Sequence, residues 1–528
     1  MESWDYIIVG SGFGGSVSAL RLVERGYKVL VLEKGRRFRP EDFPKSNWDL
    51  RRWMWLPLLG WRGLFKMTFL PHVTVLSGVG VGGGSLVYAN TLPTPKDAFF
   101  ESPPWGHLAP WKDELTEHYA TARRMLGSTR YPHWTYADEV LAEVAKDIGR
   151  PDDHHPTEVA VYFGEAGKTV PDPFFGGKGP HRTGCTGCGA CMLGCRVGAK
   201  NTLDKNYLYL AERAGLTIQP ETEVTWVKPL EGGGYRLDAL HKRTRPRHYR
   251  AHHVIFSGGV LGTVDLLLRL KGHPDGLPRL SDRLGQLVRT NSEALFGVTS
   301  NRRDVDMSKG IAITSILHTD PHSHVEPVRY PRGSGFFRLL AAPHVSGSSL
   351  PMRLARLLSA LVRQPLRTLR AYLVPDWARY TMILLYMRSV EGSLRMRLGR
   401  SVQSGFRRGL TTSLEAGPAP VASIPEATEL AERVAAKIDG TPQSILTETL
   451  LGVPSTAHIL GGCSMGDSAE SGVIDHRHRV FGYDGLYVID GSAVSANPGV
   501  NPSLTITALA ERAMSFIPGK REEPENRE

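Results

Sequence analysis

Residues 5–35 constrain the fold more than any other stretch, because they combine a strand, a glycine turn, a helix and a second strand. Residues 6–9 are a short apolar run typical of a buried parallel strand. Residues 16–25 place apolar side chains at helical spacing, and residues 27–32 form a second apolar run. The turn between the first strand and the helix contains Gly10, Gly12, Phe13, Gly14 and Gly15. This order predicts a Rossmann-type α/β domain.

The glycine turn also predicts a ligand. The first glycine allows a tight turn, the second lets the backbone approach a pyrophosphate, and the third lets helix and strand pack closely. The start of the helix presents unpaired N–H groups to the phosphates. Glu33 follows the second strand, about 20 residues after the motif, where an acidic side chain accepts hydrogen bonds from a ribose. The stretch therefore predicts a dinucleotide site.

The length and charge of the chain limit the number of domains and the kinds of partner to expect. A chain of 528 residues exceeds one ordinary core, so we expect two closely packed domains. The net charge of +11 is diffuse and no nucleic-acid motif accompanies it, so we expect no nucleic-acid partner. The glycine motif begins close to Met1, and no apolar run approaches the ~20 residues of a membrane-spanning helix. We therefore expect a cytoplasmic protein.

A second glycine-rich loop occupies residues 78–90, with the sequence GVGVGGGSLVYAN. Its glycines, which include Gly80, Gly82 and Gly83, remove side chains where a flat or anionic group must touch the backbone. Because this loop accompanies a dinucleotide motif, we expect it to contact the same cofactor.

These loops belong to a longer ordered set of motifs. Residues 256–263 (FSGGVLGT), 458–463 (HILGGC) and 485–494 (GLYVIDGSAV) follow the two glycine loops in the order found in glucose–methanol–choline (GMC) flavoprotein oxidoreductases. Residues 499–512 resemble the actinobacterial cholesterol-oxidase-like branch of that family. The likeness spans nearly the whole chain.

The resemblance implies the GMC fold, in which a Rossmann-type FAD-binding domain joins a discontinuous substrate domain built on an antiparallel sheet. The FAD-binding domain would then comprise residues 1–100, 180–290 and 440–519. The substrate domain would comprise residues 101–179 and 291–439, and residues 520–528 would form a disordered tail, since they are charged and nearly devoid of apolar residues.

The resemblance also implies FAD as the cofactor. Gly82, Gly83, Ser85 and Asn90 would line the flavin. The adenine would contact Val224, and the ribityl chain and pyrophosphate would contact Asp490 and Gly491. Some relatives attach FAD covalently through a histidine just before the second loop, but residues 76–77 are Leu and Ser here. We therefore expect non-covalent FAD.

The implied reaction is oxidation of a hydroxyl group on a sterol or a similarly hydrophobic alcohol. His458 would accept the hydroxyl proton, because a neutral imidazole can do so near neutral pH. Asn501 would hold the same hydroxyl and border the flavin. Glu326 falls where cholesterol oxidases have an active-site glutamate, and its alternative is a solvent-facing strand residue. The competing class is an electron-transfer or lipid-binding protein without alcohol chemistry, and the presence of both His458 and Asn501 favours the enzyme.

Four of the five cysteines form one run: Cys185, Cys188, Cys191 and Cys195. This spacing is that of a bacterial-ferredoxin cluster, without its usual following proline. It predicts an iron–sulfur cluster, of 4Fe–4S or 3Fe–4S type, with structural zinc or free thiols as the alternatives. A cluster would pass electrons singly to an external acceptor protein. Without a functional cluster, the protein would be an oxygen-using cholesterol or steroid oxidase.

Two stretches have the composition of a membrane-contacting surface. Residues 51–73 mix tryptophans and phenylalanines with arginines and a lysine, which suits a lipid headgroup region, a cavity lid or a core. Residues 352–373 predict an amphipathic helix with leucines on one face and arginines on the other, kinked at Pro365. Such a face packs either on lipid or on the protein's own core. We expect peripheral membrane contact through these stretches, on the inner face of the cell membrane.

Overall fold

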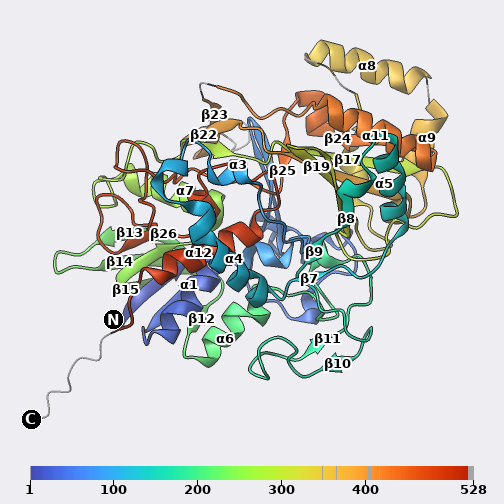
Figure 1. Ribbon diagram of the computed structural model, residues 1–528. Coiled ribbons are helices and arrows are strands. Elements are labelled where there is room, and N and C mark those ends of the chain that lie inside the picture. Colours follow the sequence, from blue (N-terminus) through green and yellow to red (C-terminus); the bar gives the residue numbers. More distant parts are fainter. Residues whose placement is uncertain are drawn as a thin grey trace, which may run out of the picture.

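The computed structural model describes residues 2–345, 347, 349–363, 365–401, 406–415 and 417–520, so most of the predicted tail at 520–528 lies outside the described residues. Two seven-stranded sheets organise the chain (Figure 1). The first has the order β12-β2-β1-β15-β14-β13, with β26 also paired to β15. Its strands are β1 (Ser3–Val9), β2 (Val29–Leu32), β12 (Thr217–Gln219), β13 (Thr222–Pro229), β14 (Tyr235–His241), β15 (Arg245–Phe256) and β26 (Leu486–Val488).

The first sheet confirms the predicted Rossmann-type domain. β1 pairs in parallel with β2 and with β15, and β26 runs parallel to β15. The apolar side chains of these strands are buried, as the continuous apolar runs predict. The helices packed around this sheet are α1 (Phe13–Glu24), α4 (Trp111–Leu126), α6 (Tyr207–Arg213), α7 (Gly259–Lys271) and α12 (Ser503–Ser515).

The glycine turn after β1 is held closely between neighbouring segments. Gly10 has a φ of 101°, which favours glycine. A Cβ on Gly14 would collide with the backbone carbonyl of Ile489, and one on Gly15 would collide with that of Gly10. The turn therefore fixes how α1 leaves β1 and where the start of the helix points.

The second sheet is antiparallel and has the order β20-β24-β17-β21-β19-β18-β8. It confirms the predicted antiparallel sheet, which also includes β24, from a stretch that the sequence analysis assigned to the FAD-binding domain. Its strands are β8 (His154–Pro156), β17 (Ala294–Ser300), β18 (Ser315–Asp320), β19 (Ser323–Val328), β20 (Ala341–Pro343), β21 (Thr381–Arg388) and β24 (Gly440–Ile445). Helices α5 (Tyr136–Asp147) and α11 (Pro425–Ile438) pack against it.

Smaller elements complete the architecture. The hairpin of β5 (Phe65–Leu70) and β6 (Val73–Gly78) pairs with β25 (Ser455–Thr456). The remaining sheet pieces are β3 (Trp55–Leu56) with β4 (Trp61–Arg62), β7 (Thr129–Arg130) with β9 (Glu158–Val159), β10 (Thr169–Val170) with β11 (Arg182–Thr183), and β16 (Val288–Arg289) with β22 (Ser393–Arg400) and β23 (Arg408–Leu414). The short helices are α2 (Leu50–Trp53), α3 (Asp97–Phe100) and α10 (Trp377–Tyr380).

The two stretches considered for membrane contact behave differently. In residues 51–73, Trp53 is fully buried and stacks on Phe65, with ring centroids 4.6 Å apart, whereas Leu58 is 94% exposed. That stretch is therefore divided between core and surface. The second stretch forms the helical segments α8 (Leu350–Arg363) and α9 (Pro365–Leu373), and α8 stands out from the substrate domain in Figure 1. The kink predicted at Pro365 adjoins residue 364, which lies outside the described residues, so it stays a prediction. Among the described residues, no helix combines the length and the apolar character needed to cross a membrane.

Candidate active site

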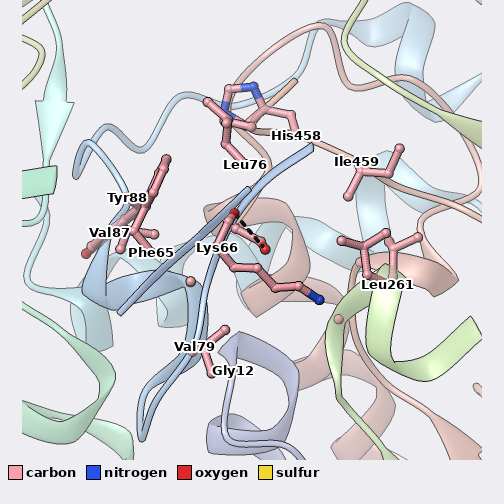
Figure 2. Close-up of a pocket in the computed structure, with 18 of the residues that line it drawn as sticks. Gly12, Phe65, Lys66, Leu76, Val79, Val87, Tyr88, Leu261, His458 and Ile459 are labelled. Carbon is pink, nitrogen blue, oxygen red and sulfur yellow. Dashed lines mark hydrogen bonds between the residues drawn. The ribbon is translucent and has the colours of Figure 1, made fainter. Parts of the chain in front are cut away.

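A cavity of about 970 Å³ runs between the two domains and is lined by residues of both. In Figure 2, Gly12, at the glycine turn after β1, and His458 lie on opposite sides of this cavity, and Asn501 also lines it. Between them the wall is formed by the second glycine loop, the β5–β6 hairpin and the start of α7. The lining of this one space therefore includes site residues predicted from distant parts of the chain.

The first glycine motif forms one end of the cavity. Gly10, Gly12, Phe13 and Gly14 line it, and Gly15 lies behind the wall. A Cβ on Gly12 would have no neighbour nearer than 3.9 Å, so a side chain there would project into the cavity. The start of α1 thus leaves open room for an anionic group beside its unpaired N–H groups.

The acid after β2 borders the same end of the cavity. The Glu33 carboxylate accepts hydrogen bonds from the backbone N–H of Ser11 at 3.1 Å, from its hydroxyl at 2.8 Å, and from the N–H of Gly35 at 2.8 Å. Val224, in β13, also lines the cavity. Glu33 is therefore held in a fixed position where an adenosine would lie.

Part of the second glycine loop lines the cavity, and the rest supports that lining from behind. Gly83 lines the cavity, and a Cβ on it would lie 2.7 Å from the Cα of Gly12, so the two glycine loops touch. Gly80, Gly82 and Ser85 stand behind the wall. The Ser85 hydroxyl donates to the carbonyl of Gly82 at 2.7 Å and accepts from the N–H of Leu203 at 3.0 Å, which stiffens the loop.

Asn90 ends the second glycine loop in a strained and buried position. Its φ is 72°, its side chain is fully buried, and neither amide atom has a hydrogen-bond partner in the described structure. It lies between two residues of the cavity wall, Ala89 and Thr91. Buried polar atoms without partners are costly, so this amide is poised to bond a ligand at the wall.

The C-terminal motif contributes Asp490 and Gly491, which both line the cavity. The Asp490 carboxylate accepts from the N–H of Gly259 at 2.9 Å and from the hydroxyl of Thr263 at 2.6 Å, both in α7. It also accepts from the N–H and hydroxyl of Ser492. Burial raises the pKa of Asp490, and these donors oppose that effect. The aspartate thereby ties α7 to the C-terminal motif at the cavity wall.

His458 forms a buried pair with a carboxylate that the sequence analysis missed. The Nδ1 atom of His458 lies 2.7 Å from Oε2 of Glu293, whose Oε1 accepts from the N–H of Ala457 at 2.9 Å. Burial lowers the pKa of the His458 imidazole, but the Glu293 carboxylate outweighs it, so the net pKa is raised. The pair fixes the ring with its Nδ1 engaged and leaves Nε2 for a substrate.

Glu293 carries little local signal. It ends a short polar run, residues 290–293, immediately before the apolar strand β17, and the whole run is buried. Buried polar residues without local partners point to distant ones. That cue identifies a candidate, but it does not name His458 as its partner.

Asn501 and Glu326 also form a pair. Asn501 lines the cavity, and its Nδ2 donates to Oε2 of Glu326 at 3.2 Å. Glu326, in β19, is fully buried, so the solvent-facing alternative is wrong. Burial raises the pKa of Glu326 to about 8. The carboxyl is therefore mostly protonated at neutral pH, and His458 is the better placed proton acceptor.

The four clustered cysteines do not form the predicted centre. All four are free, and Cys188 is exposed. Burial, together with the neighbouring thiols, raises the pKa of Cys185 to about 12, and burial raises that of Cys191 to about 11. Within the residues described, no three His, Cys, Asp or Glu side chains are arranged to hold a metal ion. The structure therefore gives no support to the predicted iron–sulfur cluster, although the four thiols lie near enough to raise one another's pKa.

The cysteine segment nevertheless borders the site. Met192, within the run, lines the cavity. The Lys200 ammonium donates to the carbonyls of Leu86, Tyr88 and Cys191 at 3.0, 2.9 and 2.8 Å. These bonds tie the run to the second glycine loop, so in this structure the segment has a supporting role.

The cavity fits an extended dinucleotide. It offers a helix start without side chains at one end, an acid and a strand for adenosine, and a glycine loop followed by titratable groups at the other end. The same features suit FAD, whose pyrophosphate and flavin would lie along this wall.

Comparison with known proteins gives consistent results. Residues 405–510 match the family model described as GMC oxidoreductase, and residues 8–39 match that of an NAD(P)-binding Rossmann-like domain. A cholesterol oxidase of Acinetobacter baumannii is 46% identical over 530 residues, covering 98% of this chain and 95% of that protein. A cholesterol oxidase of Mycobacterium tuberculosis is 45% identical over 535 residues, covering 98% and 92%. Pyridoxine 4-oxidase from Mesorbium loti has a similar fold, with a TM-score of 0.62, 16% identity, and coverage of 97% and 99%.

Proposed function

Because the chain belongs to the GMC oxidoreductase family and is an FAD-dependent alcohol oxidoreductase, we propose that it oxidises the hydroxyl group of a sterol. The observation that carries the proposal is the His458–Glu293 pair at 2.7 Å, placed beside Asn501 at one end of the cavity. The two similar cholesterol oxidases support the substrate class.

The protein's part in the reaction is to hold the hydroxyl and take its proton. Bound FAD supplies the acceptor for the hydride that leaves the carbon. Nε2 of His458 accepts the hydroxyl proton, and the Glu293 carboxylate stabilises the imidazolium that forms. Nδ2 of Asn501 donates one N–H to Glu326, and its second N–H is available for the substrate oxygen.

The cavity wall suits an apolar substrate. Strands of the substrate domain and the segments beside them contribute mainly hydrophobic side chains near His458, namely Leu295, Phe296, Ile313, Val328, Tyr330, Phe337, Trp377, Ile383 and Leu385. Such a surface excludes water and gains free energy by burying an apolar ring system. A sugar would leave its hydroxyls unpaired against this wall.

Anaerobic flavin reduction tests the proposal directly. Cholesterol in detergent micelles should bleach the oxidised flavin spectrum, whereas glucose and choline at higher concentration should not. Acid precipitation should release the yellow chromophore into solution, as expected for non-covalent FAD. A flavin that every sterol leaves oxidised would refute the proposed substrate class.

The proposed function does not include electron transfer through an iron–sulfur cluster. That prediction rests on the spacing of the cysteines, and the described geometry does not fit it. Metal analysis and visible absorbance of anaerobically purified protein test the point. Stoichiometric iron with a broad absorbance beside the flavin bands would restore the cluster and an external one-electron acceptor.

We also propose peripheral contact with the inner face of the cell membrane through α8 and α9. Apolar residues on these helices are exposed: Leu350, Met352, Leu354, Leu358, Leu361, Val362, Leu366, Leu369 and Leu373. Five arginines on the same two helices suit anionic headgroups. α8 packs beside β20, whose residue Ala341 lines the cavity, so lipid bound there would lie near the substrate end.

Flotation with anionic, cholesterol-containing vesicles tests the contact. Leu358→Glu should reduce flotation, whereas Leu414→Glu, a change at a similarly exposed leucine at the end of β23, should leave it unchanged. Added salt should weaken binding, because electrostatic attraction to the headgroups is screened. Equal flotation of both variants would rule out α8 as the contact surface.

A further inference from the structure

One half-buried cation in the cavity has no assigned role. Lys66 stands in β5, and its side chain enters the cavity from the β5–β6 hairpin (Figure 2). Its backbone carbonyl accepts from the Ser77 hydroxyl at 3.5 Å. Its ammonium, by contrast, has no hydrogen-bond or ion-pair partner among the residues that the structure describes.

The charged groups around Lys66 place it at the adenosine end of the cavity. Lys34, which follows Glu33, opposes its charge, and Glu223 in β13 and Asp265 in α7 favour it. Asp265 is already paired with Arg269 at 2.9 Å. None of these groups belongs to the His458 end, so Lys66 faces the part of the cofactor that carries phosphate rather than the reacting ring.

An isolated ammonium in such a place is unfavourable. Burial and the nearby Lys34 lower the pKa of Lys66 to about 8. A cation that is removed from water needs an anion at close range to remain charged. In Figure 2 the Lys66 amine extends toward the space between Gly12, the cap of α1, and Leu261, in the first turn of α7. The Gly12 end is where the unpaired N–H groups of α1 favour an anion.

We infer that Lys66 is the cation that binds the pyrophosphate of FAD, closing over it from the β5–β6 hairpin opposite the start of α1. The inference rests on FAD binding and not on the identity of the alcohol. The helix start supplies neutral N–H donors from one side, and Lys66 supplies a full charge from the other. The β5–β6 hairpin and the start of α1, which are distant in sequence, would thereby hold the same pyrophosphate.

The test measures FAD binding and uses no alcohol. Purified full-length holoenzyme is diluted, and the rise in flavin fluorescence gives the dissociation constant of FAD. Lys66→Met should raise that constant at least tenfold, since a charge-assisted contact of this kind is worth about one to two factors of ten. Lys66→Arg should stay within about threefold of wild type. Arg62→Met, which removes a nearby charge paired with Glu221 outside the cavity, should have no effect.

A second readout uses the pH dependence of the wild-type protein. Lys66 faces Lys34, Glu223 and Asp265, and bound pyrophosphate would raise its pKa. FAD affinity should then be full below pH ~8 and fall by about tenfold by pH ~9, as the ammonium of the free site loses its proton. Lys66→Met should abolish this dependence.

The outcomes separate cleanly. Weaker binding by Lys66→Met together with a lost pH dependence supports the inference. An FAD dissociation constant within twofold of wild type overturns it, and so does a weakened variant that keeps the wild-type pH dependence. If no sterol reduces the flavin of any variant, the proposed substrate fails while the binding result stands.

Discussion

Replacing Glu293 by glutamine should shift the pKa of His458 and, with it, the pH at which the enzyme begins to work. The carboxylate lies 2.7 Å from Nδ1 of His458, and both side chains are largely buried, at 1% and 12% exposure. At an effective dielectric constant of about 20 and a charge separation of about 4 Å, the attraction is about 4 kcal/mol. Glutamine keeps a hydrogen bond but not the charge, so we expect the pKa of His458 to fall.

The sign of the effect follows from the base role. His458 must be neutral to accept the hydroxyl proton, so flavin reduction should rise with pH through the pKa of the imidazole. In the wild type Glu293 raises that pKa, and in Glu293→Gln only the attraction of Glu326 still opposes the lowering effect of burial. The rise in rate should therefore move to lower pH. The plateau rate should also fall roughly tenfold, because a weaker base accepts the proton less readily.

Anaerobic stopped-flow measurement of flavin reduction from pH 5 to pH 9 provides the assay. Glu448→Gln is a suitable control, since Glu448 is also buried but bonds the N–H of Ser455 and does not touch His458. The control should leave the pH of the rise unchanged. A Glu293→Gln enzyme whose rate rises at the wild-type pH would show that the pair does not set the protonation of His458.

Further predictions follow from the same site. His458→Ala or Asn501→Ala should slow flavin reduction at least ~10²-fold while FAD stays bound, and near-normal rates in both variants would exclude them from proton transfer. Glu326→Gln should change the rate less than His458→Ala does, because a carboxyl with a pKa of about 8 is mostly protonated at neutral pH, and a larger loss would identify Glu326 as the base. Cys188→Ser should leave flavin reduction by substrate unchanged, measured by the same stopped-flow assay, because its exposed thiol does not line the cavity.

Local sequence patterns were enough to predict the framework of the cofactor domain. The apolar runs around the first glycine motif became β1 and β2, and the helix between them begins at Phe13. Period and glycine spacing determine such elements, because they depend on residues only a few positions apart. The motif resemblance placed His458 and Asn501, which both reach the cavity.

The remaining features depend on contacts that no local pattern encodes. Glu293 and His458 are 165 positions apart, and their pairing exists only once the substrate domain closes against the cofactor domain. Lys66 lies in residues 51–73, whose aromatic side chains suggested lipid contact. Its proposed contact with FAD depends instead on which cavity wall its side chain faces. The cysteine spacing is necessary for a cluster but does not fix where the thiols point.

The placement of β26 has a consequence for how the protein folds on the ribosome. β26 pairs with β15 in the first sheet and ends only at Val488. The substrate-domain sheet receives its last strand, β24, earlier, at Ile445. On the nascent chain β15 therefore stays without β26 while the second sheet already has all its strands. Unpaired strand edges favour aggregation, so newly emerging chains should depend on chaperones until the C-terminal segment leaves the exit tunnel.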